Sequence, residues 1–193
     1  MKKHYLLSEL TGVVLAGGKS SRFGTDKGLY PYQGKPLVQH AIDILQPFCG
    51  EMLVSTNQPE AYAFTGLKTI TDIYTDCGPL GGMHSVLKQA KGKVVYFLGC
   101  DMPGVNGQVF PFLLTHLGDY QAVVPLNNGF RETLCLAMKK ECLLTVEQAI
   151  QQKKFRILDM LEALKVSYPE LSSQPFYHKE MFHNINYRKD MKE

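Results

Sequence analysis

The sequence predicts an α/β fold with a doubly wound, mostly parallel sheet, and three features lead to this prediction. Short apolar segments alternate with segments whose apolar residues recur at helical spacing, which is typical of strands joined by right-handed helical crossovers. Residues 94–99 are nearly all apolar, as expected for a strand that helices cover on both faces. Polar residues follow the ends of the predicted strands, and ligands bind at that edge of such sheets.

Length and composition are those of one ordinary globular domain, which we expect to span residues 1–193. The net charge of +3 is too small to indicate a nucleic-acid partner, and the sequence has no recognisable signal peptide or membrane span. The five cysteines include no C-x-x-C pair, which argues against a zinc site or a disulfide framework. We therefore expect a cytoplasmic protein that binds neither nucleic acid nor membrane, and we expect a monomer.

The first predicted strand, residues 12–15, runs into a glycine-rich loop that begins Ala16-Gly17-Gly18. Glycines after a strand let backbone N–H groups approach an anion closely. Lys19, Arg22 and Lys27 add positive charge to the same loop, so it is predicted to hold a nucleotide phosphate. The spacing matches neither the P-loop nor G-x-G-x-x-G. The alternative interpretation is a glycine turn whose charges are merely solvated.

Further elements of the first half follow from apolar periodicity and turn residues. Pro36 suits a first helical position, and apolar residues continue at helical spacing to Leu45. In chain order we expect a hairpin turn at 33–34, that helix, strands over 51–57 and 68–72, a helix opening from the glycine turn 77–82, and the strand 94–99.

The second half is predicted to leave the parallel pattern in a β-hairpin excursion. Asn128-Gly129 is a strong turn signal between two apolar segments. In chain order we expect a helix over 108–117, a strand over 121–126, its antiparallel return over 133–138, helices over 143–151 and 157–164, and a short strand over 182–186.

Several motifs resemble those of one enzyme family. The segment from Leu15 to Lys27, Leu-Ala-Gly-Gly-x-Ser-x-Arg-Phe-Gly-x-Asp-Lys, is similar to the opening motif of nucleotidyltransferases that activate sugars, polyols and pterins. Its Ala-Gly-Gly most resembles the molybdenum cofactor guanylyltransferases. The family's G-K-P-L, G-P-L-x-G and C-D-x-P motifs match residues 34–37, 78–82 and 100–103. Its closing N-x-N-T-P is only half present, because Tyr187-Arg188 replaces Thr-Pro.

The resemblance implies transfer of GMP from GTP to molybdenum-molybdopterin, with Mg²⁺ as cofactor and release of pyrophosphate. It implies that residues 11–104 bind the nucleotide and residues 105–193 the acceptor. The GTP-binding residues would be Leu15, Ala16, Gly17, Lys27, Asn57, Asp72 and Asp101. The catalytic residues would be Arg22, Lys27 and Asp101, with Asp101 holding the metal, and the acceptor-binding residues would be Asn184 and Asn186.

The residue types fit these roles, although each has a simpler alternative. Asp101 follows a buried strand, where a nucleotide-bound Mg²⁺ could use one carboxylate, or where an aspartate could cap the next helix. Asp72 could accept the N1–H and 2-amino hydrogens of guanine, or merely begin a turn. Alternation along residues 182–186 predicts that Asn184 and Asn186 share one side of a strand, whereas Asn also favours turns.

Other functions compatible with the same motifs remain open. The donor could be CTP, or the acceptor a sugar or polyol phosphate. A protein of a different class would bind the nucleotide without catalysis, as a partner of molybdoenzymes. The resemblance also implies partner proteins that deliver molybdopterin or receive the product.

Overall fold

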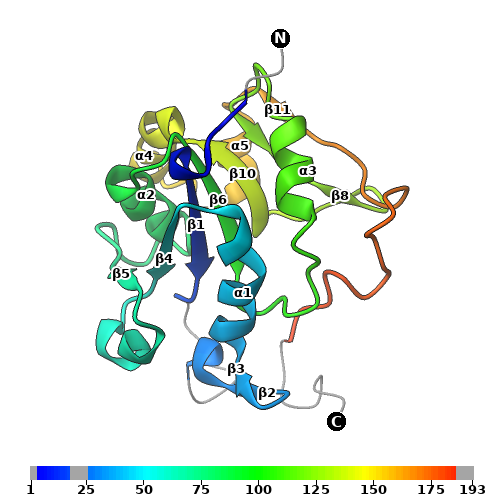
Figure 1. Ribbon diagram of the computed structural model, residues 1–193. Helices are drawn as coiled ribbons and strands as arrows, with labels where there is room; N and C mark the ends of the chain where they lie inside the picture. The colour runs from blue at the N-terminus through cyan, green and yellow to red at the C-terminus, as the bar shows by residue number, and fades with distance from the viewer. Residues whose placement is uncertain (1–3, 18–25, 186–193) are drawn as a thin grey trace.

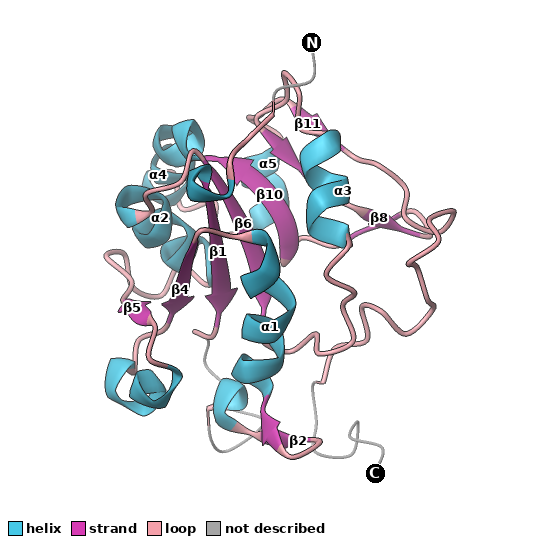
Figure 2. Ribbon diagram, viewed as in Figure 1, coloured by secondary structure: helices cyan, strands magenta, loops and turns pink. Residues whose placement is uncertain are grey.

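A computed structural model of the chain describes residues 4–17 and 26–185, and its central feature is one seven-stranded sheet (Figures 1 and 2). Its order is β11-β7-β10-β6-β1-β4-β5. β10 is antiparallel to both of its neighbours, and every other pair is parallel. The strands are β1 (Leu10–Leu15), β4 (Glu51–Ser55), β5 (Lys68–Ile70), β6 (Val94–Gly99), β7 (Ala122–Val123), β10 (Cys135–Lys139) and β11 (Val166–Ser167).

Helices cover both faces of the sheet, so the predicted doubly wound α/β fold is confirmed. α1 (Leu37–Leu45) and α3 (Val109–Thr115) contribute to the core on one face. α2 (Pro79–Gln89), α4 (Leu143–Gln151) and α5 (Ile157–Leu161) contribute to the core on the other. Strands of both predicted halves enter the same sheet.

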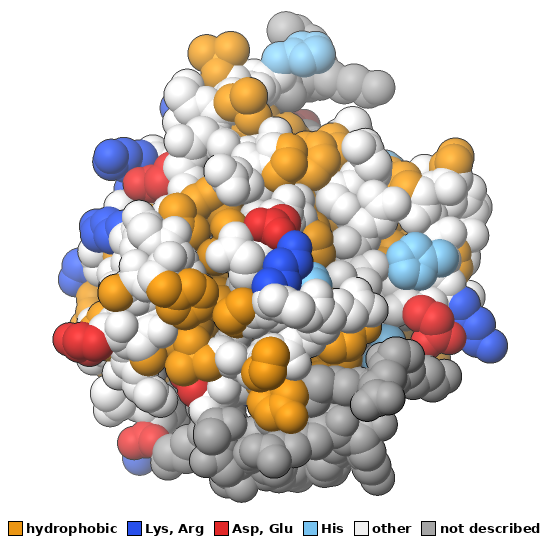
Figure 3. All heavy atoms as spheres, turned by 60° about the horizontal axis from the view of Figure 1, so that its bottom comes forward, with side chains coloured by type: hydrophobic (Ala, Val, Ile, Leu, Met, Phe, Trp, Pro, Cys, Tyr) orange, Lys and Arg blue, Asp and Glu red, His pale blue; other side chains and the backbone are white. Residues whose placement is uncertain are grey.

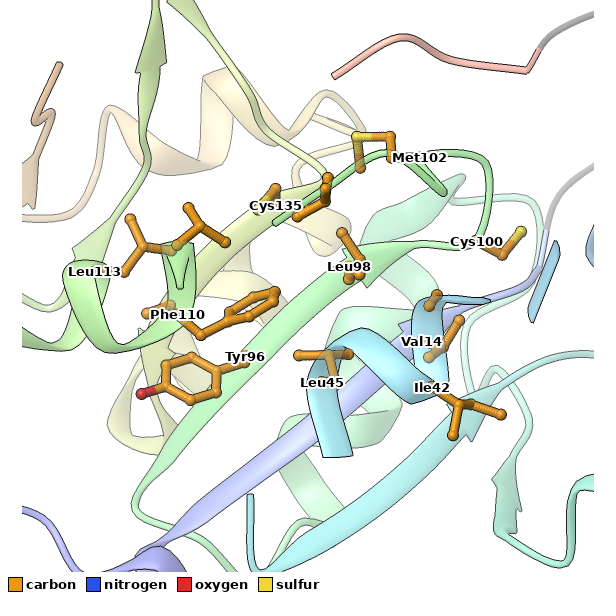
Figure 4. Packing of buried hydrophobic residues seen from close by; sticks show 14 of the residues in the cluster. Val14, Ile42, Leu45, Tyr96, Leu98, Cys100, Met102, Phe110, Leu113 and Cys135 are labelled. Carbon is orange, nitrogen blue, oxygen red and sulfur yellow. The ribbon is translucent and has the colours of Figure 1, made fainter. Parts of the chain in front are cut away.

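Alternation along the central strands divides the core into these two layers. In β1, Val13 packs on the α2 side and Val14 on the α1 side, and Phe97 and Leu98 of β6 divide in the same way. Figure 4 shows the α1 layer, in which side chains of β6 meet those of α1 and α3. These four side chains have no exposed surface. Because β6 is buried on both faces of the sheet, its sequence is a continuous apolar segment.

Two small hairpins confirm the predicted turns. Gln33-Gly34, with φ of 46° and 83°, joins β2 (Pro31–Tyr32) to β3 (Lys35–Pro36). Asn128-Gly129, with φ of 50° and 81°, joins β8 (Leu126–Asn127) to β9 (Phe130–Arg131). Positive φ at both central residues is the signature of the hairpin turn that matches strand twist. The second hairpin is the tip of the predicted excursion, whose base is the β7–β10 pair.

The strand expected over residues 182–186 was a wrong prediction, since residues 182–185 form no strand. Phe182 and Ile185 are both buried, and a spacing of three is incompatible with the two-residue period of a strand. The segment is anchored instead by the Ile185 N–H, which donates to the backbone oxygen of Asp101 at 2.9 Å. Asn186 lies outside the described residues.

Smaller differences concern element ends and unpredicted elements. β4 and β5 end two residues before the expected ends, and α5 ends at Leu161 rather than at residue 164. The sequence did not indicate β11 or the 3-10 helix Pro59–Thr65. Among the described helices, none combines the length and apolarity needed to cross a membrane.

Candidate functional site

A cavity of about 680 Å³ lies where β1, β4 and β5 end. Five of the predicted GTP-binding residues line it: Leu15, Ala16, Gly17, Asn57 and Asp72. The other lining residues are Asp26, Ser55, Thr56, Gln58, Asp76, Gly78, Pro79 and Gly82. Parallel strands bring their carboxyl ends to one edge, so residues far apart in sequence meet here as the sequence predicted.

Gly17 has no structural need to be glycine within the described part of the chain. Its φ lies outside the left-handed region, and a Cβ there would come no closer than 3.9 Å to the Ser55 backbone oxygen. The glycine therefore leaves open space in the cavity wall that a side chain would fill. This is the local geometry that close approach of a ligand to the backbone requires.

Asp72 and Asn57 form a reciprocal pair in the cavity wall. The Asn57 Nδ2 donates to Asp72 Oδ2 at 3.0 Å, and the Asp72 N–H donates to Asn57 Oδ1 at 3.0 Å. These two bonds fix the orientation of the amide and hold the carboxylate in place. Burial raises the pKa of the Asp72 carboxyl, and the hydrogen bond from Asn57 partly opposes this shift.

Two glycines at the start of α2 allow the segment carrying Asp72 to lie against the helix. A Cβ on Gly82 would lie 2.4 Å from Ser55 Oγ. A Cβ on Gly81 would lie 2.5 Å from the Tyr74 backbone oxygen and 3.2 Å from Asp72 Oδ2. The contacts at 2.4 and 2.5 Å are closer than packing permits, so the glycines are a condition for this arrangement.

The beginning of α2 is fixed by two further features. Gly78, immediately before the helix, has φ 57° and ψ −149°, a conformation essentially restricted to glycine. Within the helix, the buried Ser85 hydroxyl accepts from the Ile73 N–H at 2.7 Å and donates to the Gly81 oxygen at 3.0 Å. Ser85 therefore ties the residue after Asp72 to the helix.

Lys27 and Asp101 form an ion pair at the same edge of the sheet. The Lys27 Nζ lies 2.9 Å from Asp101 Oδ2, and the side chains are only 17% and 16% exposed. Asp101 is no helix cap, because the next helix begins at Val109, and that alternative is excluded. A Cβ on Gly99 would lie 2.7 Å from Asp101 Oδ1, so the glycine admits the carboxylate over the end of β6.

Tyr62 supports this site, although no pattern in the sequence indicated it. Its fully buried hydroxyl donates to Asp26 Oδ1 at 2.7 Å and lies 3.4 Å from the Ala16 backbone oxygen. Gly28 must lack a side chain, because a Cβ there would lie 2.4 Å from the Tyr62 oxygen. Tyr62 thus fixes Asp26, the residue immediately before Lys27, relative to the end of β1.

The oxygen ligands near Asp101 fit a magnesium ion that arrives with a nucleotide. Asn184 Oδ1 is buried and has no hydrogen-bond partner among the described residues, and the next residue, Ile185, is bonded to Asp101. Mg²⁺ commonly takes one or two protein oxygens and completes its shell with phosphate and water. In the described ranges, no three His, Cys, Asp or Glu side chains gather into a metal site. The Asp101 carboxylate and the Asn184 oxygen would suit Mg²⁺ whose remaining ligands come from a substrate and from water.

Two predicted residues, Arg22 and Asn186, lie outside the described residues, as does most of the glycine-rich loop.

Figure 3 turns this end of the molecule toward the viewer. On the part of the face that is not grey, acidic and basic side chains are interspersed and form no extended patch of one sign.

Comparison with known proteins gives consistent matches. A family model described as the MobA-like NTP transferase domain matches residues 12–166. A probable molybdenum cofactor guanylyltransferase of Carboxydothermus hydrogenoformans is 31% identical over 182 residues, 93% of this chain and 92% of the relative. A molybdenum cofactor guanylyltransferase of Yersinia pseudotuberculosis is 46% identical over 99 residues, about half of each chain.

Solved structures match over nearly the whole length. Molybdopterin-guanine dinucleotide biosynthesis protein A from Archaeoglobus fulgidus has a TM-score of 0.78 and 25% identity, and 94% of each chain is covered. A CMP:2-keto-3-deoxy-manno-octonic acid synthetase complexed with CTP has a TM-score of 0.67 at 16% identity, over 85% of this chain and 90% of the other. The second likeness shows a shared fold alone.

Proposed function

This chain belongs to the family of MobA-like NTP transferase domains, and on that premise we propose that it is a molybdenum cofactor guanylyltransferase. It transfers GMP from GTP to molybdenum-bound molybdopterin and releases pyrophosphate. The names of the relatives support this reaction, and the cavity with the polar residues around it supports substrate binding at this edge of the sheet.

The observation that carries the guanine assignment is the Asp72 carboxylate in the cavity wall, held by Asn57 at 3.0 Å. A carboxylate accepts two hydrogen bonds side by side, and guanine presents the N1–H and 2-amino donors in that arrangement. Adenine and cytosine lack this donor pair, so either base would leave a half-buried carboxylate with poorer partners. Guanine binding at Asp72 therefore selects GTP.

The phosphates lie between the backbone of Ala16 and Gly17 on one side and the Lys27–Asp101 pair on the other. The Lys27 ammonium, held largely out of solvent, stabilises the negative charge that grows on the phosphate oxygens as the bond to pyrophosphate breaks. When bound, Mg²⁺ would neutralise phosphate charge, and Asp101 would hold it with Asn184 as a second oxygen ligand.

The group transfer needs no nucleophilic side chain from the protein. An oxygen of the acceptor's terminal phosphate forms a bond to the α-phosphorus of GTP, and the bond from the α-phosphorus to the bridging α–β oxygen breaks. The electron pair of that bond leaves with pyrophosphate. Lys27 stays protonated and transfers no proton in this step; it acts through its positive charge. We assign acceptor binding to Asn184 and Asn186.

Five free cysteines, four of them buried, fit the cytoplasmic location that we propose for the reaction. We propose that the enzyme works as a monomer with GTP and molybdopterin as small-molecule substrates. Proteins that deliver the acceptor or take up the product would be its partners.

The test is a transfer assay with purified protein, Mg²⁺, molybdopterin and each of the four labelled nucleoside triphosphates, followed by chromatography of the products. We expect labelled molybdopterin guanine dinucleotide from GTP and little product from the other three. Equal use of CTP would assign the protein to cytidylyl transfer. Product only with a sugar or polyol phosphate in place of molybdopterin would reassign the acceptor. Nucleotide binding without product would leave a binding protein.

A further inference from the structure

A second carboxylate at the same edge of the sheet matches Asp72 in its surroundings. Glu132 lies between β9 and β10 and is half-buried. The Asn127 Nδ2 donates to Glu132 Oε1 at 2.9 Å, as Asn57 donates to Asp72. Burial raises the pKa of Glu132, and the hydrogen bond from Asn127 partly opposes this shift. The pKa of Asp72 is raised by burial and opposed by an asparagine in the same way.

The other oxygen of this carboxylate is free to meet a ligand. Glu132 Oε2 has no hydrogen-bond or ion-pair partner among the described residues. On the same face of the hairpin, Phe130 is 76% exposed and stands opposite Asn127 across the turn, so their side chains share that face. An exposed ring beside an oriented amide and carboxylate is a surface for a flat, polar heterocycle.

The asparagine that holds Glu132 is itself fixed in orientation. Asn127 Oδ1 accepts from the Tyr177 hydroxyl at 2.9 Å, and the Tyr177 oxygen in turn accepts from Asn128 Nδ2 at 2.8 Å. Because Oδ1 already faces a donor, the amide nitrogen must face Glu132. The Glu170 carboxylate also holds the Asn128-Gly129 turn in place. It accepts from the N–H groups of Asn128 and Gly129 at 3.2 and 3.1 Å.

Glu132 lies on the other side of Asp101 from Asp72. β10 pairs with β6 through Cys135 opposite Leu98, and the Leu134 oxygen accepts from the Gly99 N–H at 2.8 Å. Glu132 therefore precedes β10 at the end of β6 that leads into Asp101. In the sheet order, β10 is next to β6 on one side, whereas β5, which leads to Asp72, is three strands away on the other. Figure 1 shows the hairpin with β8 and the strand β5 on opposite sides of β6.

We propose that Glu132, oriented by Asn127, binds the pyrimidine edge of the acceptor's pterin by accepting from its N3–H and 2-amino groups, an inference that rests on the proposed function. The two substrates of that reaction carry the same chemical signature, because a pterin repeats the 2-amino-4-oxo pyrimidine of guanine. The molecule offers two carboxylate–asparagine pairs for two such edges, with Asp101 and Lys27 between them. Glu132 is then the residue that determines the acceptor heterocycle.

Glu132→Gln tests this with the smallest change. The glutamine keeps an oxygen for Asn127 Nδ2 and replaces the unpaired Oε2 by an NH2 that would face the ligand's own donors. The probes are pterin and lumazine, followed by their fluorescence during titration of the protein. Lumazine has an oxygen in place of the 2-amino group. A carboxylate that accepts from that amino group should therefore bind lumazine more weakly than pterin.

We expect the wild-type protein to bind pterin about tenfold or more tightly than lumazine, and Glu132→Gln to lose that preference. Glu141→Gln makes the same chemical change at an exposed glutamate beyond the opposite end of β10 and should keep the preference. Thermal unfolding of each variant separates a lost ligand contact from a lost fold. Equal binding of pterin and lumazine by the wild type, or an unchanged preference in a folded Glu132→Gln protein, would overturn the inference.

The binding test needs neither GTP nor turnover, so its failure differs from failure of the proposed function. If the wild type transfers GMP to molybdopterin but the acceptor KM of Glu132→Gln is unchanged, the function stands and the Glu132 assignment is wrong. If the protein prefers pterin through Glu132 but makes no dinucleotide, the proposed reaction is wrong and the pterin site stands.

Discussion

The two carboxylate–asparagine pairs use the same chemistry but are supported by different parts of the chain. Asp72 and Asn57 are 15 residues apart and follow the adjacent parallel strands β5 and β4. Asn127 depends on Tyr177, which is 50 residues further along the chain. The sheet itself therefore fixes the Asp72 pair, whereas hydrogen bonds between loops fix the Glu132 pair. We infer that the proposed acceptor site around Glu132 tolerates less change in the last third of the chain than the proposed nucleotide site around Asp72 does.

Packing around the two pairs also differs. At Asp72 the fold is crowded, since a Cβ on Gly81 would come within 3.2 Å of the carboxylate. At the hairpin, a Cβ on Gly129 would meet no described atom within 4 Å. The proposed nucleotide site is thus defined by close packing against α2, and the proposed acceptor site by an open hairpin. Substitutions should separate these two kinds of support.

The largest effect is expected from Asp101→Asn. Asp101 is proposed to hold Mg²⁺ at the reacting phosphates, and it is not proposed to bind either heterocycle. Loss of its charge should lower kcat about 100- to 1,000-fold. Neither the GTP KM nor the acceptor KM should change much, since both binding edges remain. Steady-state kinetics in both substrates checks this, with the exposed Asp119→Asn as the control. Near-normal kcat at saturating Mg²⁺ would remove Asp101 from the chemistry.

Asp72→Asn should act on the nucleotide side alone. The amide cannot accept both guanine donors, and the loss of roughly 1–3 kcal/mol corresponds to about a 5- to 150-fold rise in the GTP KM. The preference for GTP over ATP should fall by a similar factor, as competition between the two labelled nucleotides would measure. An intact preference would mean that Asp72 does not read the base.

Gly81→Ala should damage the nucleotide side through packing. The added methyl meets the Tyr74 backbone oxygen at 2.5 Å, so the segment that carries Asp72 must move. We expect a loss of about 1–3 kcal/mol in unfolding free energy and about a tenfold weaker affinity for GTP. Denaturant unfolding and calorimetry with GTP measure the two effects. A variant with normal GTP affinity would show that the glycines serve the fold and not the site.

Tyr177→Phe should give a smaller change on the acceptor side alone. It removes the donor that holds Asn127 Oδ1, so the amide can rotate away from Glu132. The loss of one hydrogen bond of about 1 kcal/mol corresponds to roughly a fivefold weaker affinity for pterin. Tyr32→Phe, which removes an exposed hydrogen bond near the chain's first hairpin, is the control. Unchanged pterin binding in Tyr177→Phe would separate Tyr177 from the acceptor site.

The smallest effect concerns stability. Burial raises the pKa of both Asp72 and Glu132, so each folded carboxyl holds its proton to a higher pH than the unfolded one. Stability therefore falls as pH rises from the unfolded pKa through the folded pKa, and the loss is complete above that window. Asp72→Asn and Glu132→Gln should each raise the Tm by a few degrees at most at pH 7, with no gain below about pH 4. A lower Tm at pH 7 would show that the carboxylates support the fold.

The cavity proposed to bind the nucleotide was largely predictable because it depends on local patterns. Strand ends in a parallel sheet share one edge, so knowing where β1, β4 and β5 end was enough to bring Gly17, Asn57 and Asp72 to one cavity. Tyr62 was missed because it acts through a tertiary contact. Tyr62 lies in a 3-10 helix whose sequence has no apolar periodicity, so its contact with Asp26 could not be predicted.

The surroundings of Glu132, the proposed acceptor site, were less predictable because they depend on where the second half of the chain returns to the sheet. The turn at Asn128-Gly129 is visible in the sequence. The pairing of β10 with β6, which brings the segment with Glu132 to the end of β6 that leads into Asp101, is not. The buried Phe182 and Ile185 were interpreted as strand residues, although they pack from a segment without strand pairing.

The most direct test of the two-pair arrangement is a matrix of initial rates over GTP and molybdopterin for the wild type, Asp72→Asn and Glu132→Gln. We predict that Asp72→Asn raises the GTP KM and leaves the acceptor KM within about twofold, and that Glu132→Gln does the reverse. If both variants raise the same KM, or if Glu132→Gln changes neither, the two carboxylates do not divide the substrates between them.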